Sequence, residues 1–250
     1  MKETFRLSKY FAVPAGIFAL AVIIYYLGIF NKLLFPNPAI ILKEFVLLLT
    51  NKEIVSEFGL TFSRVLATVL ISALIGIPAG LVLGYNKSLY RSFEFVIDFC
   101  RSIPPIALFP LFMLFLGIGD SSKIAYGVWV ASLVILVNTS YGVFHLNKAY
   151  LKIAQVYNAT KLYLFSHIIF PAALPNIFAG LRIGASLSLM AIIVTEMFIG
   201  SSNGLGHAIL DAQLNYKIPQ MYAIILMTGL MGYLINQVLM LIEKRTIHWI

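Results

Sequence analysis

The sequence predicts an all-α membrane protein with about six transmembrane helices, and three observations lead to this fold class. Hydrophobic residues make up 60% of the 250 residues and charged residues only 11%, whereas soluble domains average about 45–50% and about 25%. The mean hydropathy is +0.93. The apolar residues also gather in stretches of about 20, the length with which a helix crosses a hydrocarbon core of about 30 Å. We therefore expect a single transmembrane domain over residues 1–250, with its core at about 58–245.

Six segments are long and apolar enough to span a bilayer. The first follows three basic residues, but its apolar run exceeds a signal-peptide core and no small-residue cleavage site follows it, so we interpret it as a retained helix. The loop after it contains about 12 apolar-rich residues following Asn37, which are too few to span and predict a short surface helix capped by Asn37. The predicted spans are Phe11–Phe30, Thr61–Tyr85, Phe93–Leu116, Ile124–Phe144, Ala172–Ile199 and Gln220–Ile242.

Basic residues are distributed unequally between alternate loops. If the N-terminus is inside, ten lie on the cytoplasmic side and five on the other side. Lys and Arg collect on cytoplasmic loops, so this bias predicts that both termini are cytoplasmic. The inner set is Lys2, Arg6, Lys9, Lys87, Arg91, Lys148, Lys152, Lys161, Lys244 and Arg245, and the outer set is Lys32, Lys43, Lys52, Lys123 and Lys217.

Several polar residues and two prolines lie within the predicted spans. Asp98 and Arg101 are three residues apart and can pair on one helix face. Arg182 and Glu196 are fourteen residues apart, or about 21 Å along a helix, so each needs a partner from elsewhere. Two interpretations stay open for these charges: they stabilise helix packing, or they line a translocation path. The candidates for the path or its gate are Arg64, Asp98, Arg101, Pro104, Pro105, Asn138, Arg182 and Glu196.

Small residues and prolines suggest local geometry in the second and third spans. Gly76, Gly80 and Gly84 recur every four residues and predict a ridge for close helix packing. Pro104 and Pro105 break the third span, which is equally consistent with a plain kink and with a hinge or pathway. The stretch SSNGLGHAIL is interpreted as a loop that turns the chain back toward the membrane on the outer side.

The longest predicted cytoplasmic segment, at about residues 145–170, reads as helix, tight turn and helix. Lys148–Tyr157 contains good helix formers, and Asn158 tolerates the left-handed conformation that ends many helices. Thr160 can cap a second helix, and Pro171 and Pro175 lead into the fifth span. From spacing alone, the segment is either an amphipathic helix on the membrane surface or a docking element for a cytoplasmic partner.

This segment resembles the cytoplasmic coupling loop of ABC-transporter permease subunits, which belong to binding-protein-dependent importers. The family pattern is Glu-Ala-Ala, three residues, Gly, nine residues and Ile-x-Leu-Pro. Ala154, Ile168 and Pro171 match it, whereas Lys152 and Asn158 replace its Glu and Gly. The stretches LTFSRVLATVLISALIGIPAGLVLG, RSIPPIALFPLFMLFLGIGDSSK, FPAALPNIFAGLRIG and EMFIGSSNGLGHAI follow in the order found in the nitrate, sulfonate, taurine and bicarbonate branch.

The resemblance implies a type I ABC importer permease fold with a cytoplasmic coupling helix between spans 4 and 5. It implies a homodimer in the cell (inner) membrane, two copies of a cytoplasmic ATPase subunit and an extracytoplasmic substrate-binding protein. The cargo would be a small anion such as a sulfonate, nitrate or bicarbonate, or alternatively a pyrimidine vitamin precursor or a flavin. The residues implied to couple to the ATPase are Ala154, Asn158, Ala159, Thr160, Tyr163, Leu164 and Pro171.

Other functions find less support in the sequence. No P-loop motif occurs, so we expect ATP and Mg²⁺ to bind the partner ATPase and this chain to bind no cofactor. Four separated histidines and the single Cys100, expected to be a small buried side chain, predict no metal site, and no nucleophile–base pattern predicts an enzyme. In a membrane protein, the net charge of +8 reflects loop topology rather than a nucleic-acid partner. A stand-alone secondary transporter or channel remains the alternative from a different class.

Overall fold

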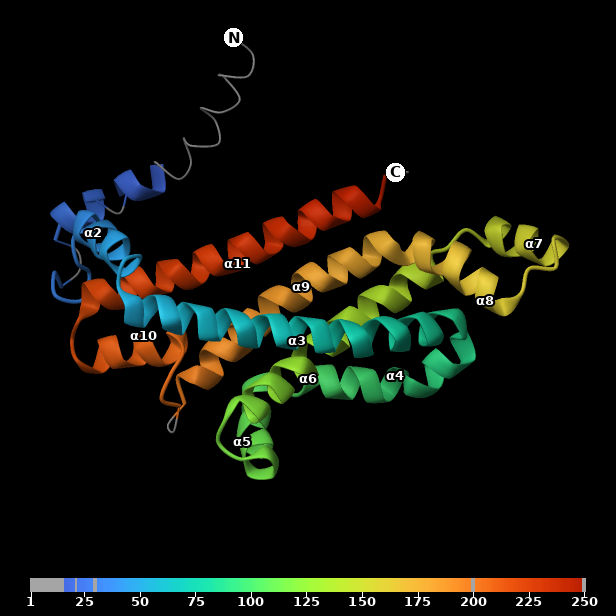
Figure 1. The fold of residues 1–250 in the computed structure, drawn as a ribbon, viewed down its shortest axis with the longest axis horizontal. Coiled ribbons are helices and arrows are strands. Elements are labelled where there is room, and N and C mark those ends of the chain that lie inside the picture. Colours follow the sequence, from blue (N-terminus) through green and yellow to red (C-terminus); the bar gives the residue numbers. More distant parts are fainter. Residues whose placement is uncertain (1–15, 21, 29–30, 199–200, 249–250) are drawn as a thin grey trace, which may run out of the picture.

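The computed structural model describes residues 16–20, 22–28, 31–198 and 201–248, and this part of the chain is a bundle of helices (Figure 1). Most of the predicted first span, Phe11–Phe30, lies outside the described residues; 16–20 and 22–26 within it are helical. The helices are α2 (Pro38–Leu48), α3 (Lys52–Tyr85), α4 (Lys87–Ser102), α5 (Pro105–Leu116), α6 (Asp120–Phe144), α7 (Lys148–Val156), α8 (Lys161–Leu164), the π-helical turn η1 (Phe165–Ile169), α9 (Phe170–Glu196), α10 (Leu205–Leu214) and α11 (Ile218–Thr246).

Four of the described helical segments are long and apolar enough to cross a membrane unbroken: α3, α6, the continuous segment Lys161–Glu196, and α11. They confirm the predicted second, fourth, fifth and sixth spans. The second span starts at Lys52 rather than at Thr61, because Asn51 accepts hydrogen bonds from the N–H groups of Glu53 and Ile54 and so begins α3 earlier. An apolar window marks the membrane-embedded part of a helix, and the helix itself can extend beyond it.

The predicted third span is two helices rather than one, since α4 and α5 are bent by 93°. Ile103 and Pro104 between them are extended, with ψ of 126° and 116°. A proline disfavours the helical conformation of the residue before it, and two prolines in succession impose this on two residues. Cys100 in α4 is only partly buried, which differs from the expected buried position.

The centre of the bundle is the packing of α6 between α3 and α9. The predicted glycine ridge lies at the α3–α6 contact: a Cβ at Gly80 would be 2.6 Å from the carbonyl oxygen of Leu136, and one at Gly76 would be 2.8 Å from that of Ser132. A Cβ at Gly84 would be 2.7 Å from Cβ of Val143. The three glycines therefore allow the backbones of α3 and α6 to approach closely, as their spacing predicted.

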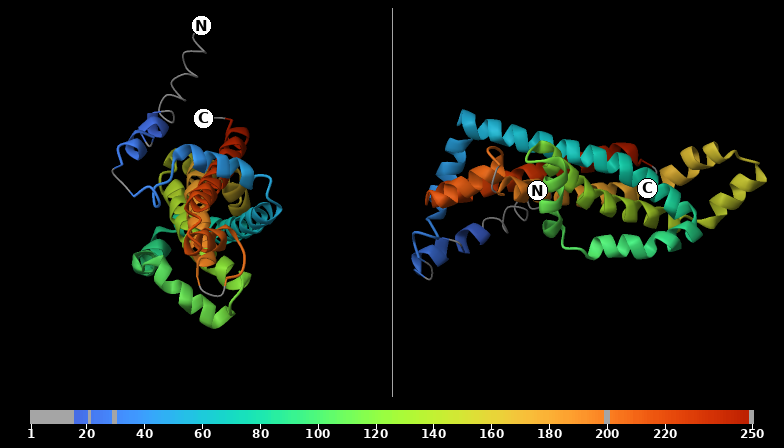
Figure 2. Two further views of the ribbon diagram at one scale, coloured as in Figure 1. Left: turned by 90° about the vertical axis from the view of Figure 1, so that its left-hand side faces the viewer. Right: turned by 90° about the horizontal axis from the view of Figure 1, so that it is seen from below.

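The two ends of the bundle differ (Figures 1 and 2). At one end lie α2, α10 and the start of α11, whose apolar side chains, including Leu205, Ile224 and Met231, form one core cluster. The predicted surface helix is α2, and Asn37 caps it by accepting a 2.9 Å hydrogen bond from the N–H of Ala39. At the other end, α7 and α8 form a hairpin that projects beyond the long helices.

Candidate functional site: a projecting hairpin and a buried charge cluster

The α7–α8 hairpin has the local geometry predicted for residues 145–170. Asn158 has a φ of +49°, and the N–H of Ala159 closes the end of α7 by donating to the carbonyl oxygen of Ala154 at 2.9 Å. Thr160 caps α8, because its Oγ1 accepts a 3.3 Å hydrogen bond from the N–H of Tyr163. An asparagine can adopt the left-handed conformation at low cost, so Asn158 forms this turn in place of the glycine of the coupling-loop pattern that the segment resembles.

The hairpin leaves large apolar side chains uncovered. Tyr157 and Leu162 are 81% and 80% exposed, and Tyr163 is 52% exposed. Leu164, in contrast, is half-buried and packs on the cluster that contains Ile169. Leu164 thus packs partly on the bundle while Leu162 points outward, and the contact of Leu164 with the ATPase stays a prediction. A pocket of about 530 Å³ between the two helices is lined by Ile153, Ala154, Tyr157, Ala159, Thr160, Tyr163, His167 and Ile168.

The second helix of the hairpin continues directly into a span. Helical structure runs unbroken over Lys161–Glu196, with η1 inserted before Pro171. Pro171 stands in the first turn of α9, where a missing N–H is tolerated, and Pro175 lies within the helix rather than at its entry. One continuous helical segment therefore connects the hairpin to the far end of α9.

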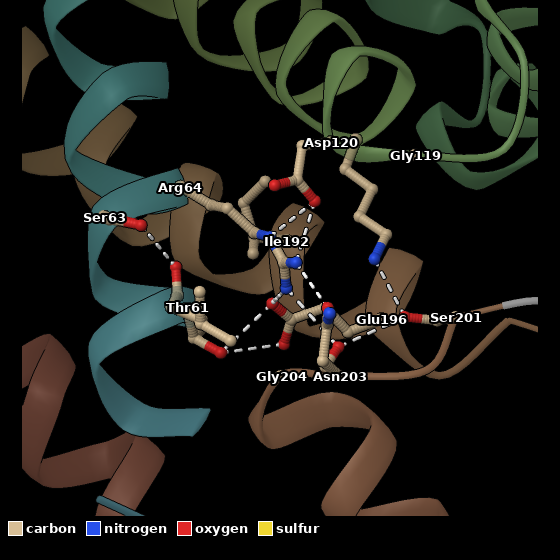
Figure 3. Close-up of polar contacts among 12 residues, drawn as sticks. Thr61, Ser63, Arg64, Gly119, Asp120, Ile192, Glu196, Ser201, Asn203 and Gly204 are labelled. Carbon is tan, nitrogen blue, oxygen red and sulfur yellow. Dashed lines mark hydrogen bonds and ion pairs between the residues drawn. The ribbon is translucent and has the colours of Figure 1, made fainter. Parts of the chain in front are cut away.

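A cluster of charged side chains lies buried near that far end (Figure 3). Arg64 on α3 is 4% exposed and Glu196 on α9 is 0% exposed, and Arg64 Nη1 lies 2.6 Å from Glu196 Oε1. Thr61, one helical turn before Arg64, donates its hydroxyl to the same carboxylate. Buried charges are tolerated when they are paired and hydrogen-bonded, and this pair meets both conditions.

Two further elements contribute to the cluster. Asp120, in the first turn of α6, accepts a hydrogen bond from Arg64 Nε at 2.9 Å while remaining 57% exposed. Asn203, in the loop after α9, accepts from Arg64 through both its backbone and its side-chain oxygen. The ammonium of the buried Lys123 donates to Ser201 in the same loop at 2.8 Å. Arg64 thus links α3, α6, α9 and the loop.

The stretch SSNGLGHAIL does more than turn the chain. The N–H groups of Gly204, Leu205 and Gly206 begin α10, and they donate to Glu57, Thr61 Oγ1 and Glu196 Oε2 respectively. The first N–H groups of an α-helix have no hydrogen-bond acceptor within the helix, so here the acceptors come from α3 and α9. This role is not apparent from the sequence, because the acceptors lie on other helices. The only local signal was the Gly-x-Gly at positions 204–206, which leaves room for carboxylates against the backbone.

The remaining path candidates lie elsewhere. Arg182 pairs with Glu243 on α11 at 3.3 Å, and so, as predicted, it does not pair with Glu196. Asp98 and Arg101 form the predicted pair on α4, at 3.6 Å and with both side chains exposed. Asn138 bonds the carbonyl oxygen of Val134 in its own helix, and Pro104 and Pro105 form the α4–α5 break. Of the eight candidates, only Arg64 and Glu196 meet in the cluster.

Among the described residues, no group of three or more His, Cys, Asp or Glu could hold a metal ion.

The described residues form a bundle of membrane-length helices with one broken span and one projecting hairpin, which is the architecture of an α-helical integral membrane protein. Residues 72–248 match the family model described as the inner membrane component of binding-protein-dependent transport systems. This match covers more than half of the chain, so the protein belongs to that family, the permeases of ABC importers.

Curated relatives agree with this assignment. The chain is 31% identical over 195 residues to the nitrate import permease protein NrtB of Synechocystis, with 78% of this chain and 70% of that protein covered. It is 27% identical over 248 residues to SsuC of Bacillus subtilis, a permease protein named for aliphatic sulfonates transport, with 99% and 90% covered. A probable ABC transporter permease protein of Brucella melitensis is 29% identical over 226 residues, with 90% and 91% covered.

A solved structure shares the fold. A chain of the MetNI methionine ABC transporter, in an inward-facing conformation, superposes with a TM-score of 0.66 at 21% identity. The match covers 74% of this chain and 92% of that chain. It confirms the expected type I importer permease fold.

Proposed function

We propose that this permease takes a small solute from an external binding protein and releases it into the cytoplasm by alternating access, driven by a separate ATPase subunit. The observation that carries the proposal is the α7–α8 hairpin, which projects from the bundle and continues through η1 into α9. Closure of two ATPase subunits would displace the two hairpins of a permease homodimer. The continuous segment Lys161–Glu196 would carry that displacement to the opposite end of the spans.

The exposed surface of the hairpin suits a protein partner better than a lipid surface. Leu162 and Tyr157 provide uncovered apolar area, and the pocket beside them has the size to accept a side chain. The hairpin also lies at the end of the bundle opposite α2 and projects beyond the other long helices (Figure 1). We infer that this end, the hairpin and both termini are cytoplasmic, in agreement with the distribution of basic residues.

Leu162→Asp tests this coupling role. It places a charge in the inferred interface and should abolish copurification of the ATPase subunit and ATP-dependent uptake, while the permease still inserts into the membrane. The matched control is Leu214→Asp, the same substitution at an exposed leucine of the opposite end, where Leu214 is 69% exposed. The control should keep the ATPase. Normal ATPase copurification and uptake with Leu162→Asp would refute the docking role of the hairpin.

The cargo is inferred from the relatives. NrtB is named for nitrate and SsuC for aliphatic sulfonates, so we propose a small oxyanion. A pyrimidine vitamin precursor or a flavin is the alternative. Calorimetric titration of the partner binding protein with nitrate, sulfonates, bicarbonate, pyrimidines and riboflavin separates them, because only the true class should bind at micromolar concentration. Uptake into vesicles with an ion gradient but no ATP would instead indicate a stand-alone secondary transporter.

A further inference from the structure

The α7–α8 hairpin carries basic residues and no acidic residue. Residues 145–170 contain no Asp or Glu, and the nearest acidic residues in the sequence are Asp120 and Glu196. Both belong to the charge cluster near the far end of α9. The lysines and histidines of the segment are Lys148, Lys152, Lys161, His145 and His167. Any charge that the hairpin carries at neutral pH is therefore positive.

Membrane topology accounts for the lysines of the hairpin but not for its lack of acidic residues. Lys and Arg collect on cytoplasmic loops, whereas Asp and Glu contribute little to the choice of orientation. Helix α4 begins and helix α11 ends toward the same end of the bundle (Figure 1), and both carry charges of either sign. Their acidic residues are Glu94, Asp98 and Glu243. The uniform charge is therefore a property of the hairpin surface itself.

Two of the lysines are exposed beside the uncovered apolar side chains of the hairpin. Lys152 lies one helical turn before Val156, which is 78% exposed. Lys161 directly precedes Leu162, which is 80% exposed. Neither ammonium forms an ion pair with any other described residue. Exposed apolar side chains bordered by charge are typical of a surface that binds another protein.

We propose that the groove of the ATPase subunit that receives the hairpin is acidic, with carboxylates opposite Lys152 and Lys161. The proposal rests on the docking role in the proposed function and adds the chemistry of the partner surface. Complementary charges at the rim of an interface increase the rate of association, and like charges suppress wrong partners. Lys152 also stands where the coupling-loop pattern has a glutamate. An acidic groove would therefore accept this hairpin and repel one that carries the glutamate.

The shape of the hairpin favours the ATPase over a lipid surface, although anionic headgroups also attract lysines. A pocket of about 530 Å³ opens between α7 and α8, and its lining includes Ile153, Ala154 and Ile168. A helix that rests on a bilayer lies flat with one apolar face against the acyl chains. The hairpin instead projects beyond the other long helices and offers a hollow that a side chain of a protein partner can fill (Figure 1).

Charge reversal in the assembled transporter tests the proposal. Lys152→Glu together with Lys161→Glu should lower copurification of the ATPase subunit by about fivefold or more, a factor that corresponds to about one kcal/mol. The matched control is Lys43→Glu together with Lys217→Glu, which makes the same change of net charge at exposed lysines of the opposite end. The control should keep the ATPase.

Salt dependence supplies a second readout. Salt screens pairs of exposed charges, so copurification of the unaltered permease should fall as salt is raised from about 50 mM to about 500 mM. In the neutral variant, Lys152→Gln together with Lys161→Gln, copurification should be lower at low salt and should depend less on salt. Copurification of the unaltered permease that does not change with salt would overturn the acidic groove.

The same variants separate the acidic groove from its alternatives. Loss of the ATPase from the reversed variant in lipid-free detergent and in nanodiscs of phosphatidylcholine or phosphatidylglycerol supports the groove. Loss only with phosphatidylglycerol would assign the lysines to lipid headgroups and overturn the proposal. A reversed variant that keeps the ATPase, while Leu162→Asp loses it, would refute the acidic groove and leave the docking role standing. If Leu162→Asp also keeps the ATPase, the docking role fails and the groove with it.

Discussion

Arg64 and Glu196 are 132 residues apart in the sequence and form a buried ion pair of 2.6 Å between α3 and α9. Every other member of the cluster contacts one of these two residues or the loop that they hold. Glu196 also accepts the N–H of Gly206 at 3.0 Å, so the same carboxylate fixes the start of α10. The pair therefore ties two spans to a helix at the end of the bundle opposite the hairpin.

Glu196→Ala should destabilise the permease strongly, because it leaves the buried guanidinium of Arg64 without its main counter-charge. Loss of one partner of a buried pair costs about 3–5 kcal/mol. Thermal unfolding of the detergent-solubilised protein measures the loss. Asp120→Asn is the control: Asp120 also pairs with Arg64 but is 57% exposed, and exposed pairs contribute about 0–1 kcal/mol. Equal losses in the two variants would contradict the central position of Glu196.

Gly80→Ala should weaken the packing of α3 on α6. The new Cβ would lie 2.6 Å from the carbonyl oxygen of Leu136, which is backbone and cannot rotate away. Overpacking of this kind costs about 1–3 kcal/mol. Gly59→Ala in the same helix meets nothing within 4 Å and should be neutral or stabilising by about 0.5–1 kcal/mol, as alanine favours helix. We expect a lower unfolding temperature for Gly80→Ala and an unchanged or higher one for Gly59→Ala, and an unchanged temperature for Gly80→Ala would contradict the close α3–α6 contact.

Gly204→Ala should lower the stability of the protein by more than backbone strain alone would, because it also disrupts the charge cluster. Gly204 has a φ of +106°, and a Cβ there would clash with the carboxyl group of Glu196. Gly117→Ala is matched in strain, because its φ is +77°, but its Cβ would meet nothing within 4 Å. Strain alone costs about 1–3 kcal/mol. A loss of stability in Gly204→Ala no larger than in Gly117→Ala would show that the carboxylate does not closely fill this site.

Exchanging the two charges of the Arg182–Glu243 pair should preserve the contact between α9 and α11. The two charges are 3.3 Å apart and partly exposed, at 38% and 24%. Arg182→Glu alone places two carboxylates together and should lower stability, and adding Glu243→Arg should recover it. A double-mutant cycle should give a coupling of about 0.2–1 kcal/mol, typical of partly exposed pairs. A coupling of zero would mean that the two side chains contribute independently.

The local features of this protein followed from short stretches of sequence. The long apolar windows predicted α3, α6, α9 and α11, and single side chains predicted the caps at Asn37 and Thr160 and the left-handed Asn158. The four-residue spacing of glycines predicted the α3–α6 ridge. Each of these depends on residues within a few positions of one another, which is why the pattern alone was sufficient. Leu164 packs partly on the bundle, which the local pattern did not indicate, because the side of α8 that faces the bundle depends on where η1 places it. Its contact with the ATPase stays a prediction.

The partners of the charged residues were decided only by the tertiary structure. The sequence established that Glu196 and Arg182 need partners from elsewhere, and it offered no means of choosing Arg64 and Glu243. It also gave no sign that the backbone of residues 204–206 would bind side chains of α3 and α9. Hydropathy and spacing report on the neighbours of a residue along one helix. Contacts between helices depend instead on how the spans pack and rotate against each other, and only the assembled bundle defines that.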